Sequence, residues 1–129
     1  GAEGGCQAEC GSASAMAAAS AVQLGKGTPS MCLNAGAIVI KSVLGLVCDP
    51  VAGLVASPCA KRNAMGAVEA MAAADMALAG VESVIPFDEV VDAMYRVGRA
   101  MPCELRETAL GGLATTPTAL EIQKRIFGK

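Results

Sequence analysis

The sequence predicts an all-α fold, a compact bundle of about four to six alanine-rich helices with a cysteine-bearing loop. The 129 residues are 53% hydrophobic but only 2% aromatic, and 26 of them are alanine. With so few aromatic residues, the hydrophobic core must be built from small and medium-sized side chains, which let helices approach closely. No segment alternates apolar and polar residues convincingly, so we expect no strand. We expect residues 1–129 to form a single domain.

The first two helices have clear boundary signals. Residues 6–24 are rich in alanine and are followed by Gly25, a residue typical of the position just after a helix. Thr28 and Pro29 have the side chains of an N-cap and of a first helical residue. A second helix is therefore predicted from Pro29 to about residue 44.

A loop and a third helix follow. Two prolines and a glycine interrupt regular structure over residues 46–58, which we expect to form the loop. The third helix is predicted over residues 61–79, ending at Gly80. One of its faces has large apolar side chains at helical spacing, and we expect that face to fill the core. The face consists of Met65, Val68, Ala72 and Met76.

The fourth helix is predicted between Pro86 and Pro102. Its apolar stripe consists of Val90, Met94, Val97 and Met101, and Asp92 and Arg96 are spaced for an ion pair on the wet side. Residues 103–112 read as a polar connector. Thr116 and Pro117 repeat the helix-start signal, which predicts a tail helix over residues 117–129.

Charge and hydropathy exclude two classes of partner. The net charge is −2 and there is no basic patch, so we expect no nucleic acid. The longest apolar run starts at Ala35 but is interrupted by Lys41 and then by Asp49. It is shorter than the roughly 20 residues that a spanning helix needs, so we expect no membrane insertion.

The chain start and the cysteine content indicate a compartment. Glu3 and Glu9 stand where a secretory signal would be basic, so we expect no signal peptide. Six cysteines without such a signal favour reduced thiols and a cytoplasmic location. The chain begins at Gly1 without a methionine, which leads us to expect a fragment or a processed chain.

Three cysteines lie in polar, turn-like stretches. Cys6 and Cys59 each stand at a predicted helix start, where the helix dipole stabilises a thiolate. Cys48 lies between them in a loop that can bend toward both. Close pairs of the C-x2-C type are absent, so spacing alone is a weak metal signal. Two interpretations stay open at this point: the three thiols are ligands of one site, or they are small buried residues.

Polar side chains near these cysteines are candidates for binding a substrate. Lys61, Arg62 and Asn63 follow Cys59 and form a compact set of donors. An arginine there would clamp a carboxylate bidentately, whereas the alternative is a solvated first helical turn. Arg106 belongs to a second polar cluster, which either lines the same binding site or forms an exposed loop.

Other reactive groups are few. Cys10 lies four residues after Cys6, on the same helix face, and we expect a spare thiol near the site. Cys32 is expected in the core. The sequence has no histidine, which excludes a Ser-His-Asp triad. Lys61 and Glu3 are the candidates for a general base, with Glu104 as a further possibility.

Four stretches together resemble the iron–sulfur-dependent L-serine dehydratases, in the C-terminal half of the α chain or α domain. They are residues 3–9 (EGGCQAE), 46–53 (LVCDPVAG), 58–63 (PCAKRN) and 106–113 (RETALGGL). The resemblance covers nearly the whole sequence, to about residue 118. The cysteine order C-x41-C-x10-C is similar to the ligand pattern of this family.

The resemblance implies a [4Fe–4S] cluster held by Cys6, Cys48 and Cys59, with one iron left free for the substrate, L-serine. The implied reaction is dehydration and deamination to pyruvate and ammonia, without pyridoxal phosphate. The implied partners are the missing upstream part of the α region and a β chain or β domain, and we expect a homo-oligomer. The chain alone is expected to be inactive.

Two alternatives remain. One is a related lyase of the cysteine desulfhydrase type, and the other is a non-catalytic helical interaction domain whose cysteines are incidental. The sequence does not separate a fused enzyme from a two-chain enzyme.

Overall fold

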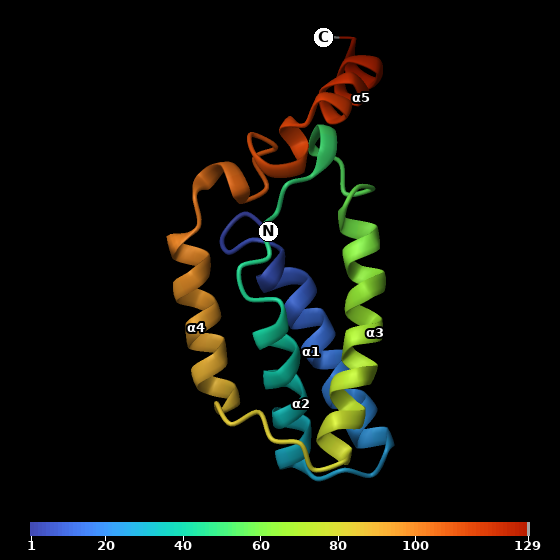
Figure 1. The fold of residues 1–129 in the computed structure, drawn as a ribbon, viewed down its shortest axis with the longest axis vertical. Coiled ribbons are helices and arrows are strands. Elements are labelled where there is room, and N and C mark those ends of the chain that lie inside the picture. Colours follow the sequence, from blue (N-terminus) through green and yellow to red (C-terminus); the bar gives the residue numbers. More distant parts are fainter. Residues whose placement is uncertain (129) are drawn as a thin grey trace.

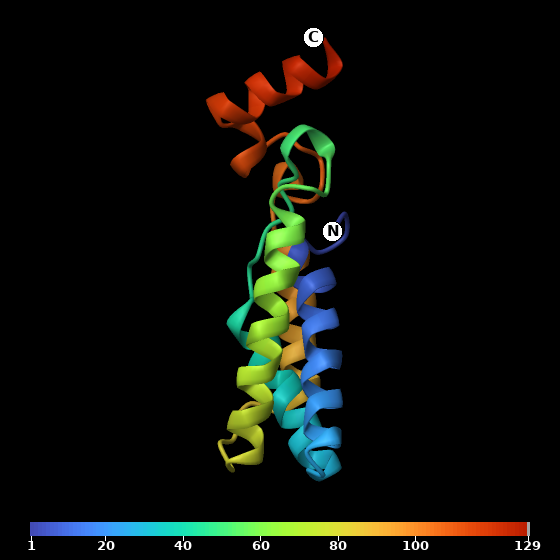
Figure 2. The ribbon, with the colours of Figure 1, turned by 90° about the vertical axis from the view of Figure 1, so that its right-hand side faces the viewer.

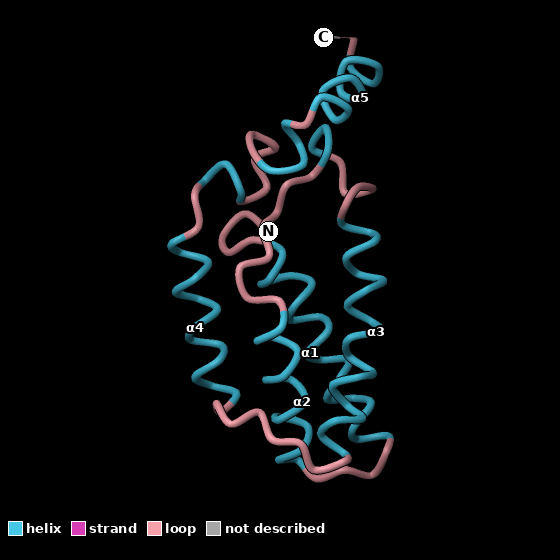
Figure 3. The backbone as a smooth tube through the Cα atoms, viewed as in Figure 1, coloured by secondary structure: helices cyan, strands magenta, loops and turns pink. Residues whose placement is uncertain are grey.

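The fold is all-α, as expected. The computed structural model describes residues 1–128, which contain five α-helices and no β-strand (Figure 3). The helices are α1 (Cys6–Leu24), α2 (Pro29–Ser42), α3 (Cys59–Leu78), α4 (Phe87–Ala100) and α5 (Pro117–Phe127). Three short 3-10 turns join them: η1 (Val51–Gly53), η2 (Cys103–Leu105) and η3 (Gly112–Thr115).

The first four helices lie side by side along the long axis of the molecule (Figures 1 and 2). Each runs antiparallel to the helix before it, so the N-termini of α1 and α3 lie at the same end as the C-termini of α2 and α4. We call this the site end. The loop that leaves α2 and the segment that leaves α4 both start there. The connectivity therefore gathers four chain segments at one end of the bundle.

Local sequence signals set the helix boundaries. The Thr28 and Thr116 hydroxyls accept hydrogen bonds from the third helical amides at 3.3 and 3.4 Å, which confirms both expected N-caps. α1 ends before Gly25, but the left-handed residue that follows is Lys26, with a φ of 60°. Gly25 has a φ of −74°, so glycine's conformational freedom is not what ends this helix.

The core is made largely of alanine and lies between α1, α2 and α3, with α4 packed on one side. Small residues allow this because they bring helix backbones close together. At Gly36, for example, a β-carbon would lie 2.9 Å from the Phe87 ring, so the glycine makes room for that ring. The fully buried residues of the core are Ala15, Ala18, Val22, Ala35, Ala37, Val39, Ile40, Ala70, Ala73, Ala74, Ala77 and Val90.

The prediction of which face of α3 fills the core is wrong. Met65 and Val68 are 67% and 61% exposed, and Met76 is also exposed. The helix instead buries a face of small residues that includes Gly66 and Ala73. An alanine-rich helix is apolar on more than one face, and close packing selects the face with the least bulk. On α4, by contrast, the expected stripe is buried or half-buried except at Val97, which is 36% exposed.

The C-terminal segment extends past the site end. α5 lies within residues 117–129, where the tail helix was expected, and it packs on η1 and η3 rather than on the four-helix body (Figure 2). Lys129 lies outside the described residues. Within residues 1–128, none of the helices combines the length and the apolar character needed to cross a membrane.

Candidate metal centre

The cysteines of interest lie together at the site end. Cys6 is the first residue of α1, Cys59 is the first residue of α3, and Cys48 lies in the loop that joins α2 to α3. Cys6 and Cys48 are only 1% and 3% exposed and share a buried cluster with Cys10, whereas Cys59 is half-buried. Cys10 therefore stands beside the site, as expected from its helical spacing, and Cys32 packs partly buried against the separate alanine core.

Backbone hydrogen bonds fix Cys48. Its amide donates to the Leu105 carbonyl at 2.8 Å, and its carbonyl accepts from the Glu107 amide at 2.8 Å. The two bonds form an isolated parallel bridge between Cys48 and Arg106. The segment that follows α4 thus holds the cysteine loop in place, a connection between residues almost 60 positions apart that no local signal predicts.

The start of α1 is fixed by Gly5 and Gln7. Gly5 has a φ of 74°, and a β-carbon there would lie 2.7 Å from the Leu46 carbonyl oxygen, so the position requires glycine. The Gln7 side chain is fully buried, donates to the Met94 carbonyl at 2.9 Å and accepts from the Gly45 amide at 2.9 Å. Gln7 therefore ties the Cys6 end of α1 to two other segments.

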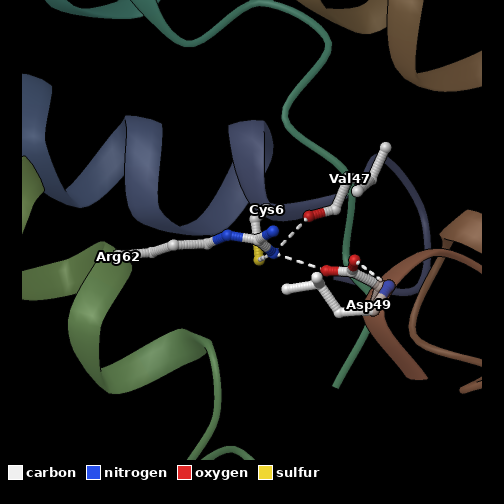
Figure 4. A network of polar contacts seen from close by, with 5 residues as sticks. Cys6, Val47, Asp49 and Arg62 are labelled. Atoms are coloured by element: carbon white, nitrogen blue, oxygen red, sulfur yellow. Dashed lines mark hydrogen bonds and ion pairs between the residues drawn. The ribbon is translucent and has the colours of Figure 1, made fainter. Parts of the chain in front are cut away.

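A buried ion pair links the cysteine segments (Figure 4). Arg62 Nη1 donates to Asp49 Oδ1 at 2.7 Å and to the Val47 carbonyl at 2.9 Å, and it lies 4.0 Å from Cys6 Sγ. The Asp49 side chain is 3% exposed and that of Arg62 is 19% exposed. The other Asp49 oxygen accepts from the Leu113 amide at 2.7 Å.

The other candidate residues have different positions. Arg106 lies at the cysteine loop, and its buried Nε has no hydrogen-bond partner among the described residues. Lys61 is exposed and lines a cavity of about 290 Å³ together with Cys10 and Arg62. Asn63 is exposed, and its amide donates to the Cys59 carbonyl at 3.0 Å.

Glu3 lies away from the thiols. Its side chain is 92% exposed and pairs with Arg99 of α4 at 3.7 Å. A cavity of about 450 Å³ is also remote, because it is lined by residues around the α3–α4 connection at the opposite end of the bundle, Ser83 and Val84 among them. The thiols and this cavity therefore do not form one site.

Electrostatics favour protonated thiols in the metal-free chain. Burial, followed by the neighbouring Cys6, raises the pKa of Cys48 to about 12. The same two causes raise the pKa of Cys10 and of Cys59, and Arg62 only partly offsets the effect at Cys59. The expected dipole effect at Cys59 is thus outweighed. Burial works to lower the pKa of Arg62, but the hydrogen bond and charge of Asp49 raise it.

The donor set fits an iron–sulfur cluster. Such clusters are held by cysteine thiolates, and N–H groups directed at the ligand sulfurs tune them. Here three cysteines from three segments are near enough to perturb one another's ionisation, and one guanidinium points at a sulfur. Within residues 1–128, no three His, Cys, Asp or Glu side chains are arranged to hold a single ion. A cluster meets its ligands at separate irons, so its thiolates stand farther apart than those of one ion.

Two residues at the centre of this arrangement, Gln7 and Asp49, are missing from the sequence-based candidates. Both stand next to a cysteine in the sequence, and both are polar but fully buried. A polar residue directly after two of the candidate ligands, Cys6 and Cys48, is the one signal that would have pointed to them.

Comparison with known proteins assigns the chain to a protein family. The family model of the serine dehydratase alpha chain matches residues 1–114. A probable L-serine dehydratase alpha chain of Bacillus subtilis is 66% identical over 128 residues, which cover 99% of this chain and 43% of that protein. The corresponding protein of Latilactobacillus sakei is 57% identical, covering 100% of this chain and 62% of the relative.

The L-serine dehydratase alpha chain of Peptoniphilus asaccharolyticus is 61% identical over 96% of this chain and 42% of its own length. The chain thus spans between 42% and 62% of the length of these relatives. A family model that matches most of the sequence, together with these identities, shows that the chain belongs to the serine dehydratase alpha-chain family.

Proposed function

We propose that this chain is the cluster-binding part of an L-serine dehydratase and that Cys6, Cys48 and Cys59 hold a [4Fe–4S] cluster. The proposal rests on the proximity of these three cysteines, from three separate segments, at one end of the bundle: Cys6 and Cys48 share a buried cluster, and Cys59 is near enough to act on the ionisation of Cys48. The relatives named L-serine dehydratase support the substrate. The products are pyruvate and ammonia. When bound, the cluster supplies a Lewis acid that makes the hydroxyl of serine a better leaving group.

The residues of this chain have three tasks in that reaction. Cys6 and Cys48 are held by backbone and side-chain hydrogen bonds from other segments, so the ligands are positioned before metal arrives. The buried surroundings of both thiols exclude water from that side of the centre. Arg106 Nε is a buried donor without a partner among the described residues, and it would reach a substrate carboxylate only if the side chain turned outward. Asn63 is a weaker candidate because its amide donates to the Cys59 carbonyl.

Proton removal from the substrate falls to Lys61 rather than Glu3 in this proposal. Lys61 lines the cavity beside Cys10, whereas Glu3 is exposed and paired on the outer side of α4. A general base must come within hydrogen-bond reach of the proton that it removes. Cysteine ligands and six cysteines without a disulfide suit a reducing cytoplasm, where we place the enzyme.

The remaining α region and a β chain complete the enzyme in this proposal. The relatives are named alpha chains and are longer than the present chain. We therefore expect little serine turnover by these 129 residues alone. The assembled enzyme, without added pyridoxal phosphate, is the form in which activity is measured.

Anaerobic reconstitution with iron and sulfide tests the proposal. We expect about four irons per chain and a broad visible absorption typical of a cluster. Cys48→Ala abolishes retention, whereas Cys32→Ala, which removes a thiol outside the site, leaves it intact. Equal iron retention by both variants would refute the ligand assignment. Full activity of the assembled enzyme after complete iron removal would refute the Lewis-acid role.

A further inference from the structure

The Arg62–Asp49 pair differs from the other ion pairs between side chains in residues 1–128. Its partners are 19% and 3% exposed and stand 2.7 Å apart. The Asp92–Arg96 pair is 3.5 Å apart, with both side chains more than 60% exposed. The Glu3–Arg99 pair is similarly exposed. Burying two charges costs several kcal/mol, and their mutual attraction offsets that cost only narrowly. A buried pair of this kind therefore needs a reason other than stability.

The contacts of Arg62 are concentrated around the cysteines. A single nitrogen, Nη1, contacts the residue before Cys48 through the Val47 carbonyl and the residue after it through the Asp49 carboxylate. The same nitrogen points at Cys6 Sγ (Figure 4). One NH2 group therefore contacts the residues on both sides of Cys48 and also reaches the sulfur of Cys6, so its two hydrogens are shared among three acceptors.

Asp49 holds this arginine in turn. Its second oxygen accepts from the Leu113 amide at 2.7 Å, so both carboxylate oxygens are occupied. A β-carbon at Gly112 would lie 2.8 Å from the Asp49 β-carbon, which shows how tightly the η3 segment packs on this side chain. The carboxylate is thereby fixed from two directions, and it fixes the guanidinium.

We propose that Arg62 is a positioning residue for the cluster, which holds Cys6 and Cys48 in register and donates a charge-assisted hydrogen bond to the Cys6 sulfur, with Asp49 as its anchor. This inference rests on the proposed function. Donation to Cys6 Sγ withdraws electron density from that sulfur, and a nearby positive charge favours the reduced form of a cluster. Arg62 thus sets the electronic character of the centre, and the carboxylate clamp suggested by its sequence position is not its role.

The reduction potential of the reconstituted cluster tests this role in the assembled enzyme. Arg62→Gln removes the charge, Arg62→Lys keeps the charge but loses the planar fork, and Asp49→Asn frees the arginine from its anchor. We expect Arg62→Gln to shift the potential to a more negative value and Arg62→Lys to shift it less. The KM for L-serine should stay within about twofold while kcat falls at least tenfold. The matched control, Arg96→Gln, alters an exposed pair and should leave the potential and kcat unchanged.

Each outcome decides the question. An unchanged reduction potential with a raised KM overturns the proposal and favours the alternative that Arg62 binds the substrate carboxylate. Loss of the cluster in the Arg62 and Asp49 variants, with an unchanged urea midpoint of the metal-free protein, supports positioning. Loss of the cluster with global unfolding of all three variants overturns it, because the pair then serves stability alone. A wild-type protein that takes up no cluster refutes the proposed function instead, so the two failures are distinguishable.

Discussion

Replacing Gln7 by methionine should destabilise the metal-free chain by about 2 kcal/mol. The two side chains have similar volume, so the change removes polar contacts without opening a large cavity. Gln7 is fully buried and makes two hydrogen bonds of 2.9 Å, to the Met94 carbonyl and from the Gly45 amide. A typical hydrogen bond contributes about 1 kcal/mol net, which gives the estimate.

The two partners limit the additional penalty. Met94 lies inside α4, where its carbonyl also accepts from the amide one turn later. Gly45 is exposed, so its amide can turn toward water. Neither group is left fully unsatisfied, and the loss should therefore not greatly exceed the two bonds.

Urea unfolding followed by far-UV circular dichroism measures the effect. The matched control is Gln23→Met, the same change at an exposed position of the same helix, which should shift stability by less than about 0.5 kcal/mol. Equal midpoints for the two variants would refute the reasoning. Because Gln7 follows Cys6, we also expect Gln7→Met to lose iron faster after reconstitution, whereas Gln23→Met should not.

Three further predictions concern the loop, the thiols and the outer face of α3. Gly112→Ala should cost more stability than Gly80→Ala in urea unfolding. Both positions have positive φ, but only at Gly112 would the new methyl overlap a buried carboxylate, and equal losses would contradict this. The metal-free chain should lose stability as the pH rises from 9 toward 12. The raised pKa of Cys48 means that the folded state favours the protonated thiol, and this contribution, fully present below the ordinary value of 9.0, fades above it. Cys48→Ser should flatten the decline between pH 8 and pH 10.5, and an unchanged slope would argue against the shift. Val68→Lys should leave the urea midpoint of the isolated chain nearly unchanged while Ala73→Lys unfolds it, and the reverse order would restore the methionine face as core.

Helix positions were predictable because their signals are local. Thr28 with Pro29, and Thr116 with Pro117, start helices through a side-chain cap and a fixed φ, which neighbouring residues alone determine. The end of α1 was located correctly even though Lys26, not Gly25, adopts the left-handed conformation. Such boundaries depend little on the rest of the fold.

The inner face of α3 was not predictable in the same way. Met65 and Val68 have the greater apolar area, and a search for apolar residues at helical spacing therefore selects them as the core face. The helix instead buries Gly66 and Ala73. The deciding quantity is the distance between helix axes, which depends on the partner helices. At Gly66 a β-carbon would collide with the Ser14 hydroxyl on α1, so that face is already at its closest approach.

The proximity of the three proposed ligands was predictable from the sequence, but the contacts that support them were not. The proximity of Cys6, Cys48 and Cys59 follows from the antiparallel order of the helices. This order places the starts of α1 and α3 at the same end as the loop that leaves α2. Asp49 and Gln7 escaped prediction because each also bonds a residue far away in the sequence, at separations of 64 and 87 residues. No local pattern encodes a hydrogen bond over such a separation.

The bridge between the Cys48 loop and the segment after α4 has a consequence for the order of assembly. Cys48 is held by residues 105–107, so its backbone is not fixed until the fourth helix has docked. Contacts between residues so far apart in the sequence form later than local ones, because the entropy of closing the intervening loop must be paid first. During this interval we expect the thiols to be separate and therefore open to oxidation or to binding of other metal ions. Iron and sulfide should therefore be delivered after the bundle has closed, and a variant that delays docking of α4 would lose yield of the mature centre without any change to its ligands.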